Sequence, residues 1–203
     1  MRKYTAIFLI TIGLLVLGSN LHSYLIGVEA VKSQKVFLNE FKDHSILHKR
    51  DFRLDQASPK KGESMGTLSI PKLGVSLPIF HGTNPDQLKR GVGHFAKSAL
   101  PGEKNNMVLS GHRDTVFRQL GKLVERDELI VSNDIGDFLY KIRKVRIVDE
   151  DDLTVIVPKP RATLTVTTCY PFYYIGNAPQ RYVVIAELIS SNLKKSKKQE
   201  DTS

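Results

Sequence analysis

The feature that most restricts the fold is a series of short strand-like segments beginning at about Met65, with few helical patterns between them. Apolar and polar side chains alternate in several of these segments, most clearly in residues 138–148 and 163–169, and a period of two is typical of half-buried strands. Prolines such as Pro71 and Pro78 suit strand ends or edges. About eight short strands predict an all-β, closed or nearly closed barrel and not a doubly wound sheet.

The first 28 residues differ from this pattern. Met1-Arg2-Lys3 is basic, and residues 4–28 then contain no Asp, Glu, Lys or Arg. This length is enough to cross a bilayer, which takes about 20 apolar residues, and the positive flank predicts a cytoplasmic N-terminus. We therefore predict a membrane-anchor helix that is not cleaved. A cleavable signal peptide is the alternative, because the most apolar part, residues 6–17, is short. Both interpretations place the rest of the chain outside the cytoplasm.

The remaining boundaries follow from composition. We predict that residues 1–28 are the cytoplasmic tip and signal anchor and that residues 29–61 are a polar stalk, which ends in the linker Ser58-Pro59-Lys60-Lys61-Gly62. Residues 62–190 are predicted to be the barrel domain, and residues 191–203 a basic polar tail.

The net charge of +9 suggests nucleic-acid binding until it is divided along the chain. Residues 62–190 carry sixteen basic and fourteen acidic side chains, a difference of +2. No basic stripe interleaved with aromatic residues is present there, so no nucleic-acid partner is expected.

The only cysteine, Cys169, lies at the end of a predicted strand because Pro171 cannot continue a ladder. One cysteine excludes an internal disulfide, a Cys-x-x-Cys pair and a multi-thiolate zinc site. Taken alone, Cys169 fits a small buried hydrophobe. However, His112 follows the strand-like residues 105–110, and Arg181 begins another strand at residues 181–189. These three residue types at strand ends are the set that thiol acyl transfer requires.

Other titratable residues favour structural roles. His94, in a glycine-rich stretch, is expected to be a packed structural histidine, and Asp114 is not expected to complete a Cys-His-Asp triad. His44 and His48 could share a helix face but lack a third ligand nearby, so no metal site and no cofactor are predicted.

Three motifs resemble those of the sortases, cysteine transpeptidases of the Gram-positive cell surface. They are the histidine in Ser110-Gly111-His112-Arg113-Asp114, the cysteine in Leu164-Thr165-Val166-Thr167-Thr168-Cys169 and the arginine in Arg181-Tyr182-Val183-Val184. The resemblance covers residues 65–190. It is strongest to class D, which the basic N-terminus, the single anchor and Cys169-Tyr170-Pro171-Phe172 fit, while class A stays an alternative.

The resemblance implies a closed eight-stranded β-barrel with the active site in a groove at its wall. It also implies a secreted substrate with a Leu-Pro-x-Thr sorting signal, cleaved after the threonine, and transfer to an amine of the peptidoglycan precursor or cross-bridge. Cys169 would be the nucleophile and His112 the general acid and then base. Arg181 would hold the substrate and stabilise the oxyanion.

Substrate-binding residues are predicted on both sides of the thiol. Thr168 precedes it, and the backbone N–H near Tyr170 is a candidate for the oxyanion site. Val155 and Ile156, in the loop from Glu150 to Arg161, are candidates for the wall that receives the signal's apolar residue. Packing of that loop onto the barrel explains the two apolar residues equally well.

Two other functions fit the same residues. An extracytoplasmic cysteine peptidase would use Cys169 and His112 but give the acyl group to water. An anchored wall-binding module would contain Cys169 only as an inert buried thiol.

Overall fold

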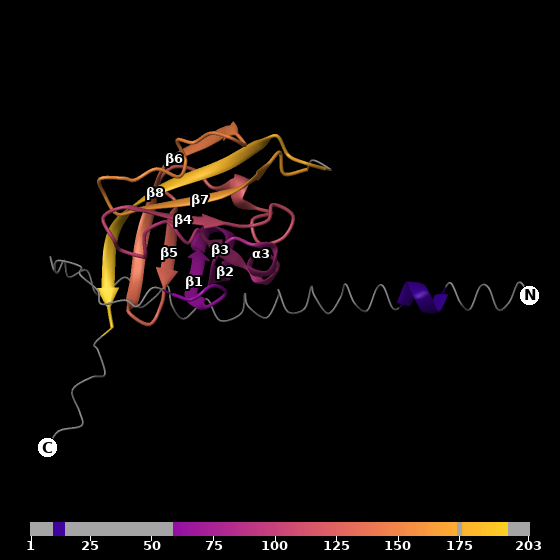
Figure 1. Ribbon diagram of the computed structural model, residues 1–203, viewed down its shortest axis with the longest axis horizontal. Coiled ribbons are helices and arrows are strands. Elements are labelled where there is room, and N and C mark those ends of the chain that lie inside the picture. Colours follow the sequence, from indigo (N-terminus) through magenta and orange to yellow (C-terminus); the bar gives the residue numbers. More distant parts are fainter. Residues whose placement is uncertain (1–9, 15–58, 174–175, 195–203) are drawn as a thin grey trace, which may run out of the picture.

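A computed structural model of the chain describes residues 10–14, 59–173 and 176–194. The described residues 59–173 and 176–194 form a β-barrel whose strands occur in the closed order β1-β2-β3-β4-β7-β8-β6-β5 (Figure 1). The strands are β1 (Ser64–Ile70), β2 (Val75–His81), β3 (Val92–His94), β4 (Asn106–Ser110), β5 (Glu128–Ser132), β6 (Gly136–Asp149), β7 (Thr163–Tyr170) and β8 (Gln180–Leu193). Short helical segments connect some of them: η2 (Pro71–Leu73), α3 (Pro85–Arg90) and η3 (Leu120–Lys122).

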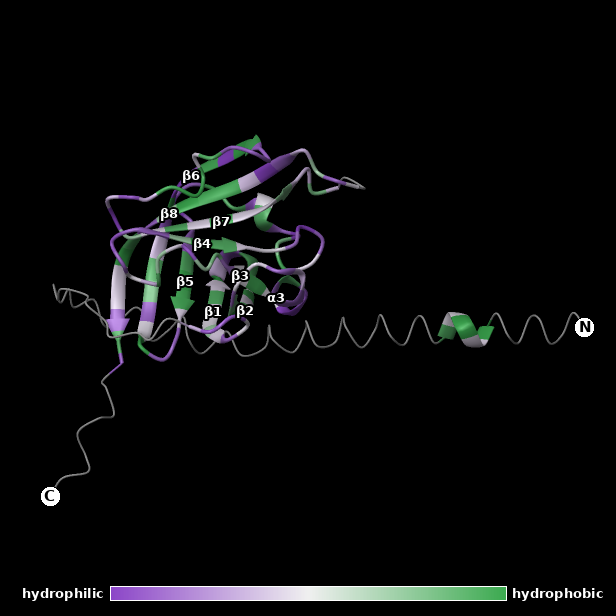
Figure 2. Ribbon diagram, in the orientation of Figure 1, coloured by the Kyte–Doolittle hydropathy of each residue, from purple (hydrophilic) through white to green (hydrophobic). Residues whose placement is uncertain are grey.

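The apolar residues of the alternating strands form the barrel core. β7 is not half-buried as its alternation predicted, because Thr163 and Thr165 are buried as well. On β7, Leu164 and Val166 are fully buried in the main core, together with Phe138, Tyr140 and Ile142 of β6. Hydrophobic residues are concentrated on the strands and hydrophilic residues on the loops (Figure 2). Burial of this apolar surface is the main source of barrel stability.

Two pairings of β7, one parallel and one antiparallel, determine which strand ends lie together. β4 runs parallel to β7, with Ser110 opposite Thr167, while β8 runs antiparallel to β7, with Arg181 opposite Cys169. The ends of β4 and β7 and the start of β8 therefore lie at the same edge of the barrel. The end of β6 joins them, because Val148 is opposite Arg181.

The predicted all-β closed barrel is confirmed, while several predicted strand limits differ from the observed ones, including the ends of β7 and β8. β7 continues to Tyr170, one residue beyond the predicted stop. β8 extends to Leu193 and not 189, because residues 190–193 pair with Gly136–Leu139 of β6 although they lack clear alternation.

The N-terminal predictions fall mainly outside the described residues. Residues 10–14 are helical, but the rest of the predicted anchor, most of the stalk and nearly all of the tail are not described. Within the part of the chain that is described, no helix combines the length and the apolar character needed to cross a membrane.

Candidate active site

Cys169 lies next to last on β7 and is half-buried, so its thiol is neither sealed in the core nor fully exposed. The main-chain pairing with Arg181 holds it at the end of the β7–β8 ladder. It lines a hollow of about 280 Å³.

His112 follows β4 by two residues and is exposed. The turn that carries it is fastened to β7 at two points. The amide of Gly111 donates to the carbonyl of Thr167 at 3.3 Å, and the buried hydroxyl of Thr168 donates to the carbonyl of Gly111 at 2.7 Å. Because β7 also carries Cys169, these bonds couple the position of the imidazole to that of the thiol.

Arg181, the second residue of β8, is held by three acceptors. Its guanidinium donates to the carbonyls of Ala178 and Gln180, each at 3.0 Å, and to Glu150 Oε2 at 3.1 Å. The amide of Glu150 in turn donates to the carbonyl of Pro179 at 3.0 Å. The guanidinium is thus oriented by the loop after β6 and by the segment that leads into β8.

The same hollow is lined by Cys169, His112 and Arg181, which come from three strand ends. The sequence placed these residues at strand ends, and barrel closure brings them together. A thiol, an imidazole and a fixed cation around one hollow are the groups that acyl transfer through a thioester needs. Their individual roles stay predictions.

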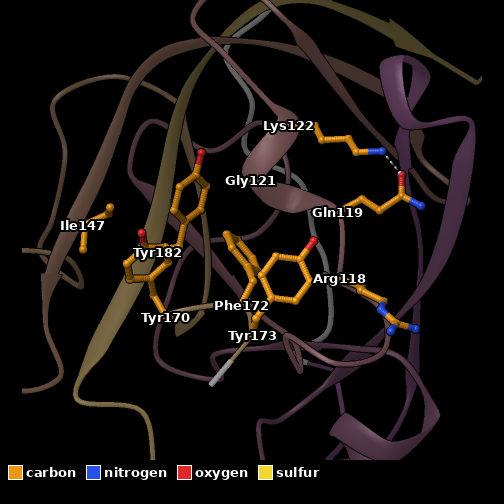
Figure 3. Close-up of a pocket in the computed structure, with 9 residues that line it drawn as sticks. All are labelled: Arg118, Gln119, Gly121, Lys122, Ile147, Tyr170, Phe172, Tyr173 and Tyr182. Atoms are coloured by element: carbon orange, nitrogen blue, oxygen red, sulfur yellow. Dashed lines mark hydrogen bonds between the residues drawn. The ribbon is translucent and has the colours of Figure 1, made fainter. Parts of the chain in front are cut away.

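The four predicted substrate-binding residues are divided between two hollows. Val155 and Ile156 line the hollow with Cys169, as does Thr168, which is 3% exposed and uses its hydroxyl on Gly111. Tyr170 instead lines a second hollow, together with Phe172 and Tyr182 (Figure 3). Cys169 and Tyr170 are successive on β7, and successive side chains of a strand point to opposite faces, although Thr168, also next to Cys169, lines the same hollow as the thiol.

Val155 contributes to loop packing as well as to the hollow. It is 8% exposed and packs with Val148 and Val183, whereas Ile156 is 48% exposed. The carboxamide of Asn106 donates to the carbonyls of Val155 at 3.2 Å and Val157 at 3.0 Å, holding this loop against β4.

His94 has the packed structural position that the sequence predicted. It is fully buried, with Nε2 2.9 Å from the carbonyl of Ala99 and Nδ1 3.1 Å from Nδ1 of His81. Its pKa is lowered to about 4: burial is the largest cause, the hydrogen bond to Ala99 acts in the opposite direction, and the nearby His81 adds a smaller lowering. Asp114 is exposed and is not among the residues that line the hollow with His112.

Sequence reasoning missed Glu150 as a partner of Arg181 and Asn106 as the anchor of the loop. Glu150 was only the start of a loop in the sequence, and nothing local connects it to a residue 31 positions away.

In residues 10–14, 59–173 and 176–194, no three His, Cys, Asp or Glu side chains form a metal-binding group.

Comparisons with known proteins agree on one family. The Sortase domain model matches residues 68–189. Sortase D of Bacillus subtilis (strain 168) is 37% identical over 198 residues, which cover 94% of this chain and all of that protein. Among solved structures, the catalytic domain of B. anthracis SrtD is 44% identical with a TM-score of 0.59, covering 71% of this chain and 100% of the other. The SrtA sortase from Actinomyces oris is 29% identical with a TM-score of 0.64, covering 68% of this chain and 86% of the other.

Proposed function

The chain belongs to the sortase family of cysteine transpeptidases, and from this premise we propose that Cys169, His112 and Arg181 carry out its cell-wall transpeptidation. The donor is a secreted protein with a Leu-Pro-x-Thr sorting signal, and the acceptor is an amine of peptidoglycan. The observation that supports these assignments is the lining of one hollow by all three residues.

In the first half-reaction, the thiolate of Cys169 attacks the carbonyl carbon of the signal's threonine. A C–S bond forms, the scissile C–N bond breaks, and the imidazolium of His112 gives its proton to the leaving amine. The product is a thioester between Cys169 and the donor protein.

Arg181 stabilises the oxyanion that develops in this step. A guanidinium stays charged at any working pH and therefore cannot act as the base. Its bonds to two carbonyls and to Glu150 limit its motion, and a donor that is already oriented needs no reorganisation when the charge forms.

In the second half-reaction, the acceptor amine attacks the thioester carbonyl. A C–N bond forms, the C–S bond breaks, and His112 takes the proton that the amine loses. The thiolate and imidazolium are thereby restored. Val155 and Ile156, at the wall of the same hollow, receive the apolar side chain of the sorting signal.

We assign residues 1–28 to a single-pass anchor with the barrel outside the cell. Support comes from the basic Met1-Arg2-Lys3 and from the absence of charged residues in positions 4–28. Reaction at the outer membrane face would bring the enzyme to secreted donors and to the cell wall.

Mass spectrometry of the full chain after mixing with a Leu-Pro-x-Thr peptide tests the proposal. A thioacyl adduct on Cys169 is expected, and adding an amine should convert it to the amide product. The variant Cys169→Ala should give neither species.

Two results would point elsewhere. Release of free acid alone at every amine concentration would favour a cysteine peptidase. Full function of Cys169→Ala in cells, with no adduct on the parent, would favour a non-catalytic wall-binding module.

A further inference from the structure

A second hollow of about 660 Å³ lies beside the end of β7 and is larger than the one around Cys169. Figure 3 shows aromatic rings in its centre, polar side chains of the segment 118–122 on one side and Ile147 on the other. It is lined by Arg118, Gln119, Gly121, Lys122, Ile147, Tyr170, Phe172, Tyr173 and Tyr182.

The centre of this hollow is a packed group of rings. Tyr170 and Tyr182 stack with centroids 6.2 Å apart, and Phe172 lies 5.7 Å from Tyr170 and 5.2 Å from Tyr182. The ring of Phe172 fits closely over Gly121, where a Cβ would come within 2.6 Å of it. Tyr173 is 94% exposed next to this group. A firm apolar surface with an exposed aromatic beside it suits a flat, amphipathic ligand such as a sugar ring.

The charge of this hollow is positive. Arg118 and Lys122 are its only charged lining residues, and both are exposed. Neither forms an ion pair with another described residue, although Lys122 donates to Gln119 at 3.2 Å. Two exposed cations outside the ion pairs of the described residues favour an anionic ligand, and phosphate and carboxylate groups are the usual partners of Arg and Lys.

Strand register connects this hollow to the thiol. Ile147 is opposite Tyr182, and both line the second hollow, while Val148 is opposite Arg181, and both line the first. On β7, Cys169 and Tyr170 are successive residues that line different hollows. The two hollows therefore lie next to the same end of β7. A thioester on Cys169 would be attached to the residue directly before Tyr170, which lines the second hollow.

We infer that this second hollow binds the acceptor, an anionic glycopeptide of the peptidoglycan-precursor type, and presents its amine to the thioester. The inference rests on the proposed function, since only a two-substrate reaction needs a second site next to the first. The rings receive the sugar, Arg118 and Lys122 receive its phosphate or carboxylate groups, and the donor occupies the hollow lined by Val155 and Ile156.

The test compares acceptors on the full chain and on a charge-reversed variant, R118E/K122E. The acceptors are a soluble diphosphate-linked muramyl peptide and a sugar-free peptide with the same amine. In the parent, the muramyl peptide should have the lower KM. In the variant its KM should rise at least about tenfold, while the KM of the sugar-free peptide and that of the donor peptide change little.

The matched control is K97E/K104E, which makes the same change in net charge at two exposed lysines that line neither hollow. It should behave as the parent, which would exclude a long-range charge effect. Tyr173→Ala tests the aromatic part and should raise the KM of the muramyl peptide alone.

Three outcomes would overturn the inference: an unchanged KM for the muramyl peptide in R118E/K122E, an equal rise for both acceptors, or a rise in the KM of the donor peptide instead. The last would assign the hollow to the donor protein. Failure of the proposed function is distinguishable, because it would appear in the parent as a lack of thioacyl adduct on Cys169 before any acceptor is added.

Discussion

At the scale of single residues, Arg181 shows what a guanidinium offers that another cation does not. Its planar guanidinium donates hydrogen bonds to two backbone carbonyls and to the carboxylate of Glu150. The side chain is 30% exposed. An ammonium group carries the same charge on one nitrogen and cannot reproduce this geometry. The orientation of the charge, and not the charge alone, is what the surrounding carbonyls and Glu150 provide.

We therefore expect Arg181→Lys to be nearly as impaired as Arg181→Ala. Both should lower the rate of thioacyl formation by about 100–1000-fold, the usual effect of losing one oxyanion donor. Burst kinetics with a chromogenic sorting peptide would measure it. Asp151→Asn, which removes an exposed carboxylate one residue after Glu150, is the control and should retain the parent rate. Near-full activity of Arg181→Lys would mean that only charge is needed.

Thr168 is expected to influence the reaction indirectly, by holding the turn that carries His112. Its buried hydroxyl binds the carbonyl of Gly111, next to His112. Thr168→Val keeps the shape and removes the donor, so it should lower the free energy of unfolding by about 1–3 kcal/mol and slow thioacyl formation. Thr168→Ser should recover most of both. Denaturant unfolding and the same burst assay give the two values, and equal activity of the Val and Ser variants would contradict a positioning role.

At the scale of elements, the loop between β6 and β7 is held in place by polar contacts near its start and in its middle. Near its start, Arg146 binds Asp152 at 3.0 Å and Thr154 at 3.0 Å, and the hydroxyl and amide of Thr154 donate to Asp152. These bonds from Thr154, with a further contribution from Arg146, lower the pKa of Asp152. Further along, Asn106 uses both amide hydrogens on loop carbonyls and accepts from Thr165 at 2.7 Å. The wall of the first hollow is thus set before any substrate arrives.

Asn106→Asp should disturb this loop because it removes both donors and places acceptors against two carbonyls. We expect a loss of at least about 1–3 kcal/mol in the free energy of unfolding and a higher KM for the donor peptide. Asn105→Asp is the matched control, since Asn105 uses only its carbonyl oxygen, which accepts from the amides of Asn106 and Lys159. Thermal unfolding and donor kinetics of the two variants should differ; equal behaviour would show that the loop does not depend on Asn106.

At the scale of the whole molecule, barrel closure buries groups that must stay neutral. His94 lies in contact with His81 and with the hydroxyl of Ser98, and burial lowers its pKa to about 4. In the unfolded chain the pKa of a histidine is about 6.5. Between these values the unfolded chain binds a proton that the folded barrel does not, so stability should fall as the pH falls from about 6.5 to about 4.

This prediction is measured by chemical unfolding at several pH values. One proton gives a slope of up to about 1.4 kcal/mol per pH unit in that range. His94→Gln should be less stable near neutral pH and should lose this part of the slope, whereas His81→Gln should keep it. An unchanged slope in His94→Gln would assign the acid sensitivity to other groups.

The periodicity of apolar residues was enough to predict the strands and the all-β barrel, because alternating apolar side chains indicate which face of a strand can be buried. They also placed Cys169, His112 and Arg181 at strand ends. Because Cys169 and Tyr170 are successive in a strand, their side chains are expected on opposite faces of it. The sequence does not indicate which hollow lies at each face.

Only the tertiary structure decided what surrounds those residues. The parallel pairing of β4 with β7, the ion pair of Arg181 with Glu150 and the bonds of Asn106 to the loop each join segments far apart in the chain. The second hollow is likewise assembled from the segment 118–122, β6, the end of β7 and the start of β8. Such contacts form only when the sheet closes into a barrel. The residue pattern of one segment does not indicate which distant segment will pack against it.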